Sequence, residues 1–290
     1  MSPSDLTLGD RLFVTIQHLL PQHALSALMY HLARCTWGPF KDTLINWFVA
    51  QFRVDMGRAV EPDPTAYPSF NAFFTRALQP EARPLAAEPA LLCPADGVLS
   101  RCGSIRRGTL IQAKGHEFTA ANLLGDAATA ALFADGTYAT IYLSPRDYHR
   151  VHMPLAGTLT SMRHIPGRLF SVNAVTARAV PGLFARNERV VCLFDTQAGP
   201  MALVMVGAIF VGSMETVWAG QVTPPQGGQP WRPDPEAQVH LGRGAEMGRF
   251  NMGSTVILLL PAGAQAWDHA LQPGSPLRMG QALGALSGRR

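Results

Sequence analysis

Glycine and proline interrupt this chain so often that no helix or strand can run far. The 290 residues include 27 glycines and 23 prolines. Because both residues favour turns and end regular elements, the sequence predicts many short elements rather than a bundle of long helices. The apolar share of 47% allows a full core, while the charged share of 15% is below the usual value of about 25%. This shortage of charge indicates a large buried fraction or a face that meets something apolar.

Helical spacing of apolar residues is confined to roughly the first 55 residues, where it predicts three short helices. Pro21 separates the first two helices, and Gly38-Pro39 separates the second from the third. The helices either cap the core or lie on a membrane surface. In the second case the apolar anchors are Phe13, Trp37, Trp47 and Phe48. The apolar positions are Leu12, Phe13, Ile16, Leu19 and Leu20, then Leu25, Leu28, Met29 and Leu32, then Phe40, Leu44, Trp47 and Phe48.

From about Leu91 onward the chain changes to short β-type runs bounded by glycine and proline. Strands and helices do not alternate regularly, so the prediction is an α+β fold with a mainly antiparallel β core. Residues 1–60 form the helical, membrane-associating segment, and residues 61–290 form the β-rich domain. Ser69–Leu78 and Ala120–Phe133 are expected to be helices, and Gly220–Asp234 an exposed loop. The predicted strands are Gly97–Cys102, Thr137–Leu143, Gly157–His164, Arg189–Thr196, Met201–Val211 and Thr255–Leu260.

Charge and cysteine content exclude several functions. The net charge is +4, with no run of five like charges, so nucleic acid is not an expected partner. None of the four cysteines forms a C-x-x-C pair, which argues against a paired-thiol zinc site and favours a reducing, cytoplasmic-side location. No apolar stretch approaches the roughly 18 residues that a membrane-spanning helix needs.

Reactive side chains gather in three places, each a weak signal alone. Asp96-Gly97 is most often only a turn. His149 and His152 would face opposite sides of a strand and lack a nearby set of metal ligands, so acid–base chemistry is the better interpretation. Gly253-Ser254 is not the nucleophile elbow of hydrolases. The glycine does, however, allow a strained peptide beside a hydroxyl, which an N-to-O acyl shift requires.

In this order the three places resemble the phosphatidylserine decarboxylases of the proteobacterial type. Met252 replaces the leucine that usually precedes Gly-Ser-Thr in that family, a change that conserves apolar volume. The resemblance runs along almost the whole chain, through Pro94–Gly97, Ala113–His116, Tyr142–Pro154, Leu169–Asn173, Phe184–Arg189, Val211–Gly220 and Glu246–Phe250.

The resemblance implies a precursor that cleaves itself between Gly253 and Ser254. Asp96 would orient His152, which would take the proton of Ser254, and the serine would attack the Gly253 carbonyl. Elimination and hydrolysis would then convert Ser254 into a covalent pyruvoyl group. The products would be chains 1–253 (β) and 254–290 (α), held together as a heterodimer; a dimer of such heterodimers is compatible with the family.

The resemblance also implies the reaction. The lipid's serine amine would form a Schiff base with the pyruvoyl carbonyl, carbon dioxide would leave, and phosphatidylethanolamine would be released. His149 would donate the proton and contact the headgroup, with no metal and no diffusible cofactor. The enzyme would be peripheral, on the cytoplasmic side of the cell membrane. Two alternatives stay open: a serine hydrolase that uses the same residues without self-cleavage, and a non-catalytic relative that only binds lipid surfaces.

Overall fold

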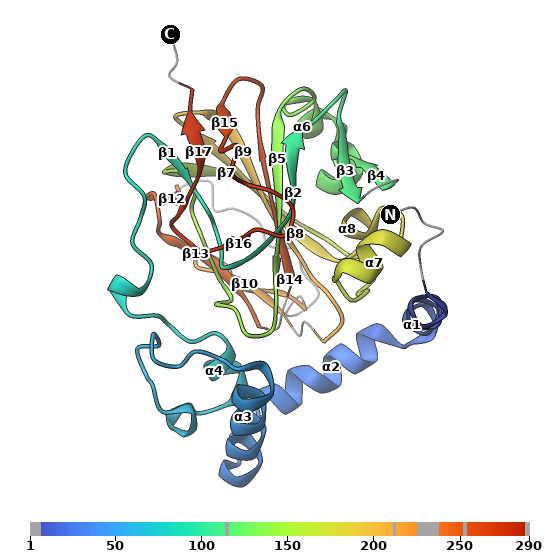
Figure 1. Ribbon diagram of the computed structural model, residues 1–290, viewed down its shortest axis with the longest axis vertical. Helices are drawn as coiled ribbons and strands as arrows, with labels where there is room; N and C mark the ends of the chain where they lie inside the picture. Colours follow the sequence, from blue (N-terminus) through green and yellow to red (C-terminus); the bar gives the residue numbers. More distant parts are fainter. Residues whose placement is uncertain (1–6, 114–115, 211–212, 225–237, 252–253, 288–290) are drawn as a thin grey trace.

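Three helices lead the chain and a β-rich body follows, as the computed structural model shows (Figure 1). The structure describes residues 7–113, 116–210, 213–224, 238–251 and 254–287. The helices are α1 (Leu8–Leu19), α2 (Gln22–Ala33) and α3 (Gly38–Phe52), which confirms the three predicted from spacing. Thr7 and Asp10 form a reciprocal capping box at the start of α1.

The other helices are short. Ser69 caps α4 (Phe70–Phe74), as predicted, because its hydroxyl accepts a hydrogen bond from the Ala72 amide at 3.2 Å. The single helix expected over Ala120–Phe133 is wrong: Gly125, at φ 68°, ends α5 and a second helix follows. The remaining elements are α5 (Ala120–Leu124), α6 (Ala127–Ala131), α7 (Ala174–Ala179) and α8 (Leu183–Arg186), with 3-10 turns at Pro64–Ala66 and Pro80–Ala82.

An eight-stranded sheet forms the centre of the body, in the order β12-β7-β8-β9-β14-β5-β2-β16. Every strand pair in it is antiparallel, in agreement with the α+β prediction. Strand β14 lies between β9 and β5, so its backbone is paired on both sides. The strands are β12 (His240–Leu241), β7 (Gly157–Ile165), β8 (Arg189–Thr196), β9 (Gly199–Val206), β14 (Ser254–Leu260), β5 (Thr137–Leu143), β2 (Gly97–Ser104) and β16 (Pro276–Leu277).

Three smaller sheets complete the body. A four-stranded sheet has the order β11-β10-β13-β6, a three-stranded one β1-β17-β15, and β3 pairs with β4. Strand β11 occupies the start of the predicted loop Gly220–Asp234; residues 225–237 lie outside the described ranges. The strands are β11 (Gly220–Thr223), β10 (Met214–Thr216), β13 (Glu246–Phe250), β6 (Arg150–His152), β1 (Ala90–Leu92), β17 (Ala282–Leu286), β15 (Gln265–Trp267), β3 (Thr109–Ala113) and β4 (His116–Thr119).

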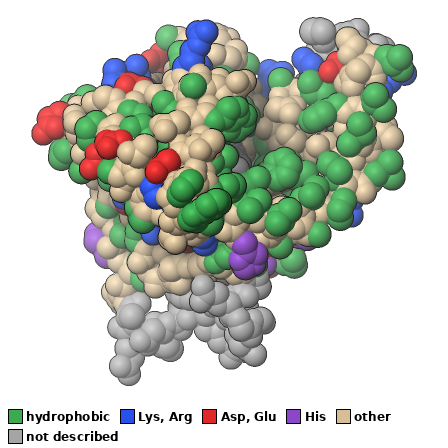
Figure 2. Space-filling view, turned by 90° about the horizontal axis from the view of Figure 1, so that it is seen from below, with side chains coloured by type: hydrophobic (Ala, Val, Ile, Leu, Met, Phe, Trp, Pro, Cys, Tyr) green, Lys and Arg blue, Asp and Glu red, His purple; other side chains and the backbone are tan. Residues whose placement is uncertain are grey.

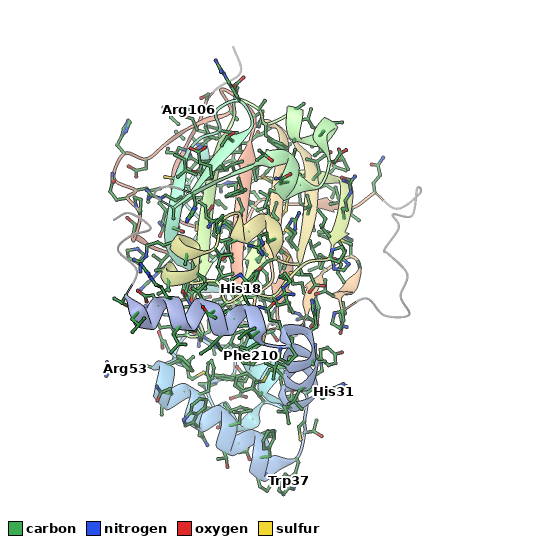
Figure 3. The ribbon with its side chains drawn as sticks, turned by 90° about the vertical axis from the view of Figure 1, so that its right-hand side faces the viewer. His18, His31, Trp37, Arg53, Arg106 and Phe210 are labelled. Carbon is green, nitrogen blue, oxygen red and sulfur yellow. The ribbon has the colours of Figure 1, made fainter. Side chains whose placement is uncertain are left out.

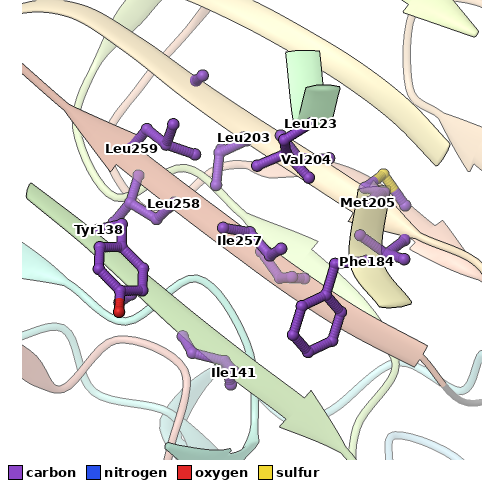
Figure 4. Packing of buried hydrophobic residues seen from close by; sticks show 14 of the residues in the cluster. Leu123, Tyr138, Ile141, Phe184, Leu203, Val204, Met205, Ile257, Leu258 and Leu259 are labelled. Carbon is purple, nitrogen blue, oxygen red and sulfur yellow. The ribbon is translucent and has the colours of Figure 1, made fainter. Parts of the chain in front are cut away.

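The main core is built around β14. Its residues Val256–Leu260 are all fully buried, as are Leu203–Met205 on the neighbouring β9 (Figure 4). Phe184 of α8 and Leu123 of α5 belong to the same buried cluster. An unbroken apolar run such as Val256–Leu260 is typical of a strand that is covered on both faces.

Helices α1 and α2 face the β body with polar side chains. The side-chain oxygens of Gln17 and Gln22 accept hydrogen bonds from the amides of Ser171 and Leu169, at 3.0 and 2.9 Å. Gln17 and Gln22 are buried, whereas most of the large apolar side chains on α1 are exposed. These exposed side chains are Leu8, Leu12, Phe13, Ile16 and Leu19.

Helix α3 packs differently. Its Phe48 is 6% exposed and lies in a second apolar cluster with Phe70, Phe73 and Phe74. The prediction of Phe48 as a membrane anchor is therefore wrong, because its ring faces α4 rather than the surface. Trp47 and Trp37 are 56% and 67% exposed, and Trp37 lies at the far end of α3 from the β body (Figure 3). Among the described residues, no helix combines the length and the apolar character needed to cross a membrane.

Candidate active site

The predicted cleavage point lies where the chain passes from the four-stranded to the eight-stranded sheet. Strand β13 ends at Phe250, whose amide donates to the His149 carbonyl at 3.0 Å. The Asn251 amide donates to the Ser213 carbonyl at 3.0 Å, and Ser254 then begins β14 opposite Leu143. Met252 and the glycine of the predicted strained peptide, Gly253, lie outside the described residues. Phe250 before the predicted cut and Ser254 after it thus belong to two different sheets.

The segment from the end of β5 to the end of β6 brings both histidines close to β13, which precedes the predicted cleavage point. After Leu143 the chain turns at Ser144, whose amide and hydroxyl both donate to the Asp147 carboxylate, at 2.7 and 2.6 Å. Strand β6 then pairs with β13, with His152 opposite Glu246. Residues 142–154 and 246–254 are far apart in the sequence. This pairing and the pairing of β5 with β14 bring them together in space.

His149 is fully buried, and one of its ring nitrogens has no partner among the described residues. Its Nδ1 lies 2.8 Å from the Asp147 carbonyl, which can only accept, so Nδ1 carries the proton. Its buried Nε2 has no hydrogen-bond partner among the described residues. Burial, reinforced by the positive charge of Arg76, lowers the pKa of His149 to about 3. The ring is therefore neutral at pH 7 and presents a bare acceptor at Nε2.

His152 is also buried, and both of its ring nitrogens have partners. Its Nδ1 donates to the Gly244 carbonyl at 2.9 Å, and its Nε2 lies 2.9 Å from the Tyr148 hydroxyl. Burial lowers the pKa of His152, opposed by the bond to Gly244 and by the charges of Glu246 and Asp96. The neutral ring, protonated on Nδ1, accepts a hydrogen bond from the Tyr148 hydroxyl at Nε2. This nitrogen is the one placed to act as a base.

Asp96 lies on the segment next to His152 but is bound to other groups. The His152 amide donates to the Pro94 carbonyl at 2.8 Å, which brings Pro94–Gly97 against β6. The Asp96 carboxylate accepts from the Arg83 guanidinium through both Nε and Nη2, and from the Met279 amide at 2.8 Å. Among the described residues, no hydrogen bond joins Asp96 to His152. The structure brings the two residues to adjacent segments without pairing them.

The position after Asp96 requires a glycine because two strands approach each other closely there. A Cβ atom at this position would lie 2.3 Å from the Tyr142 carbonyl oxygen of β5. Only glycine lets β2 approach β5 this closely at its first residue. Gly97 therefore starts strand β2 rather than forming a simple turn, and Asp96 directly precedes this strand.

An apolar cavity of about 480 Å³ opens beside the start of β14. Its volume is in the range of small-molecule sites. Leu143, whose backbone pairs with Ser254, forms part of its wall, and Phe74, whose ring centroid lies 4.1 Å from that of His149, forms another part. Phe210 lies between α1 and α3 at the cavity (Figure 3). The lining also includes Phe13 of α1 and Leu44, Trp47, Phe48 and Phe52 of α3.

Within the described ranges, no group of three or more histidine, cysteine or acidic side chains is arranged to bind a metal ion. Ser254 stands at the first position of a rigid, doubly paired strand beside an apolar cavity. Its backbone pairs with Leu143, a residue in the wall of that cavity.

Comparison with known proteins decides the family. A family model described as phosphatidylserine decarboxylase matches residues 70–285, and a second, described as PSD, matches residues 12–53. The chain belongs to the phosphatidylserine decarboxylase family. Phosphatidylserine decarboxylase proenzymes from Azotobacter vinelandii and Bordetella pertussis are 58% and 57% identical to it, over 96% and 94% of this chain. The matches cover 99% and 94% of those proteins.

The predicted site residues of this phosphatidylserine decarboxylase relative have two partners that sequence reasoning missed. Arg83 holds Asp96, and Tyr148 holds His152. Tyr148 lies inside the segment Tyr142–Pro154 that carries the resemblance, so the sequence contained a signal for it. Arg83 lies 13 residues before Asp96 in a proline-rich connector, and no local pattern marks it.

Proposed function

We propose that this chain is a self-processing decarboxylase that converts phosphatidylserine into phosphatidylethanolamine and carbon dioxide. The observation that carries the proposal is the position of Ser254. It begins the central strand opposite Leu143. Leu143 lies in the wall of an apolar cavity that is also lined by residues of the N-terminal helices. A lipid bound there would bring its headgroup to Ser254 while its chains stay among aromatic and aliphatic side chains.

Self-cleavage begins at the Ser254 hydroxyl. His152 takes the proton of Oγ, and the oxygen attacks the Gly253 carbonyl carbon. The Gly253–Ser254 C–N bond breaks as an ester forms, and the proton ends on the serine nitrogen. Loss of the Ser254 Cα proton then breaks the Cβ–Oγ bond and leaves a Gly253 carboxylate and a dehydroalanine. Water replaces the nitrogen of that residue, which leaves as ammonia, and a pyruvoyl group remains.

The surroundings of His152 support its role as the base. Burial favours the neutral ring, and Nδ1 donates to the Gly244 carbonyl, so Nε2 is left as the acceptor nitrogen. To take the serine proton, Nε2 must exchange the Tyr148 hydroxyl for that of Ser254. Asp96, held by Arg83, contributes a fixed negative charge that favours the protonated ring.

In turnover, the pyruvoyl carbonyl supplies an electron sink for the charge left when carbon dioxide departs. The apolar cavity excludes water and favours loss of the charged carboxylate. His149 is neutral before substrate binds, so it must gain a proton before it can donate one. A substrate carboxylate near Nε2 would raise its pKa and bring about that gain.

The two products of the cut would stay associated. Strand β14, in the product 254–290, is paired with β9 and β5 of the product 1–253, and Val256–Leu260 are fully buried. Strands β16 and β17 of the same product pair with β2 and β1. Separation would break these ladders and expose the core, so a stable heterodimer follows. Pairing of two heterodimers stays a prediction.

The N-terminal helices supply a surface for membrane attachment. Hydrophobic side chains form a band across the underside of the molecule (Figure 2). The large apolar side chains that α1 to α3 and the residue before α3 expose include Leu12, Leu19, Leu28, Trp37 and Trp47. An exposed apolar surface of this extent marks an interaction site. We therefore assign residues 1–60 to peripheral contact with the cytoplasmic face of the membrane. This places the cavity at the lipid surface, where the substrate is.

Carbon dioxide release from phosphatidylserine vesicles tests this proposal. The wild type is expected to release it, whereas Ser254→Ala and His152→Ala are expected to stay uncleaved and inactive. His149→Ala should still be cleaved but should turn over at least about 100-fold more slowly, the usual contribution of a general acid. Normal turnover by cleaved His149→Ala would remove that residue from the mechanism. An uncleaved wild type with esterase activity would instead indicate a serine hydrolase.

A further inference from the structure

Asn251 stands two residues before the predicted scissile bond and is held unusually firmly. It is 1% exposed. Its amide nitrogen Nδ2 donates to the Glu215 carboxylate at 2.8 Å and also to the Ser213 hydroxyl. With the backbone bond to the Ser213 carbonyl, three contacts fix this residue to the segment 213–215. Ser254 is fixed on the other side by its pairing with Leu143.

Glu215 connects Asn251 to two arginines. Its Oε2 accepts from Nε of Arg249 at 2.8 Å, and its Oε1 lies 3.8 Å from the guanidinium of Arg34. The carboxylate is mostly buried, with a side-chain exposure of 16%. A carboxylate held by two cations in a partly buried site keeps its orientation. Glu215 is therefore a rigid support for the Asn251 side chain.

Arg34 carries this network to the N-terminal helices. It caps the end of α2, and its Nη2 donates to the Ser213 hydroxyl at 3.0 Å. Its guanidinium stacks on Tyr30 of α2, 3.7 Å from the ring centroid. The Tyr30 hydroxyl donates to the Gln221 side chain on β11 at 2.9 Å. The C-terminal end of α2 is thus bound to the residues that hold Asn251.

We propose that Glu215 and Arg34 are positioning residues for self-cleavage, through Asn251. The inference rests on the proposed function, since it concerns the rate of the same cut. Only Met252 and Gly253 separate Asn251 from Ser254. A shift of Asn251 would therefore move the Gly253 carbonyl relative to the serine hydroxyl, and misplacement by about 1 Å can slow a reaction roughly 100-fold. Docking of α2 on the β body thereby influences how fast processing occurs.

A polarity exchange tests the Asn251–Glu215 contact. Asn251→Asp keeps the size of the side chain but sets two carboxylates together, so cleavage should slow by about tenfold or more. Adding Glu215→Gln restores a donor–acceptor pair with its direction reversed, and the rate should return to within about threefold of wild type. The full chain is made by cell-free synthesis, synthesis is stopped, and conversion is followed on a denaturing gel.

A structural defect is separated from a positioning defect by measuring stability without cleavage. Each substitution is repeated in the Ser254→Ala chain, and its thermal unfolding is compared with that of Ser254→Ala alone. The proposal predicts slow cleavage with a nearly unchanged melting temperature. Cleavage of Asn251→Asp at the wild-type rate would overturn it, and so would a double variant that stays as slow as the single one. A wild type that never converts would instead overturn the proposed function.

The Arg34 arm is tested against an arginine elsewhere on the helices. Arg34→Ala should slow conversion about threefold to tenfold, because Glu215 and Ser213 each lose one contact that keeps them in place. Arg11→Ala, at an exposed position of α1, should convert at the wild-type rate. Equal rates for Arg34→Ala and wild type would confine the positioning role to the β body and overturn the coupling to α2.

Discussion

The β body and the helix pair α1–α2 bury opposite kinds of side chain. In β14 the residues Val256–Leu260 are fully buried and apolar. In α1 the one residue classed as buried is Gln17, while Leu12 and Leu19 are 60% and 79% exposed. Water alone would favour the reverse orientation, because burial of a leucine side chain stabilises a fold by about 1.5–3 kcal/mol. We therefore expect the helix pair to meet a second apolar environment, whereas the β body buries its apolar residues away from water.

Helix α3 combines both arrangements in one turn. Phe48 packs among Phe70, Phe73 and Phe74, while its neighbour Trp47 is more than half exposed. A helix places adjacent residues about 100° apart, so one side of α3 can join the protein while the next faces outward. On the proposed membrane contact, the boundary between the two environments runs along this helix.

The largest expected effect separates these two neighbours. Phe48→Ala should lower the free energy of unfolding by about 3–5 kcal/mol, because it leaves a cavity in a packed aromatic cluster. Trp47→Ala should change it by less than about 1 kcal/mol, as at other exposed positions. Urea unfolding in the uncleavable Ser254→Ala chain provides the measurement.

Vesicle binding should show the opposite order. Trp47→Ala should weaken binding to phosphatidylserine vesicles about tenfold or more, since insertion of a large apolar side chain contributes about 1.5–3 kcal/mol. Folded Phe48→Ala protein should bind nearly as well as wild type. If Trp47→Ala destabilises the fold and binds vesicles normally, the outward face of α3 is not the membrane face.

A smaller effect is expected for the polar docking of α2. Gln22 accepts from the Leu169 amide and donates to the Gln17 carbonyl at 2.7 Å, and it is 3% exposed. Gln22→Leu keeps the volume but leaves both groups unpaired, which should cost about 1–3 kcal/mol of stability. Gln51→Leu, at an exposed position of α3, should have an effect within about 0.5 kcal/mol. An equally stable or more stable Gln22→Leu chain would mean that α2 docks through apolar contact, and the contrast with the β body would disappear.

Sequence periodicity located the helices and most strands, but it did not show which face of each helix is buried. The spacing at Phe40, Leu44, Trp47 and Phe48 predicts one apolar stripe, and the structure divides that stripe between α4 and the surface. Spacing is a local property, whereas burial depends on what lies opposite. Gly125 divided a predicted helix for a local reason, since a residue at positive φ ends the helical turn.

The candidate site shows the same limit. The resemblance named Asp96, His149, His152 and Ser254, and strand pairing brings their segments together. It did not reveal that Arg83 binds Asp96 or that Tyr148 occupies Nε2 of His152. These contacts depend on how side chains meet in space, and neither residue belongs to a pattern that specifies such a partner.

Intact mass spectrometry of the purified wild-type chain tests the central claim most directly. The account predicts two chains, one ending at Gly253 with a free carboxylate and one beginning with a pyruvoyl group at position 254. The second chain should lack the mass of its α-amino nitrogen and should react with a carbonyl reagent, and Ser254→Ala should give one intact mass. A single full-length mass for active wild-type protein, or a cut at any other bond, would contradict the account.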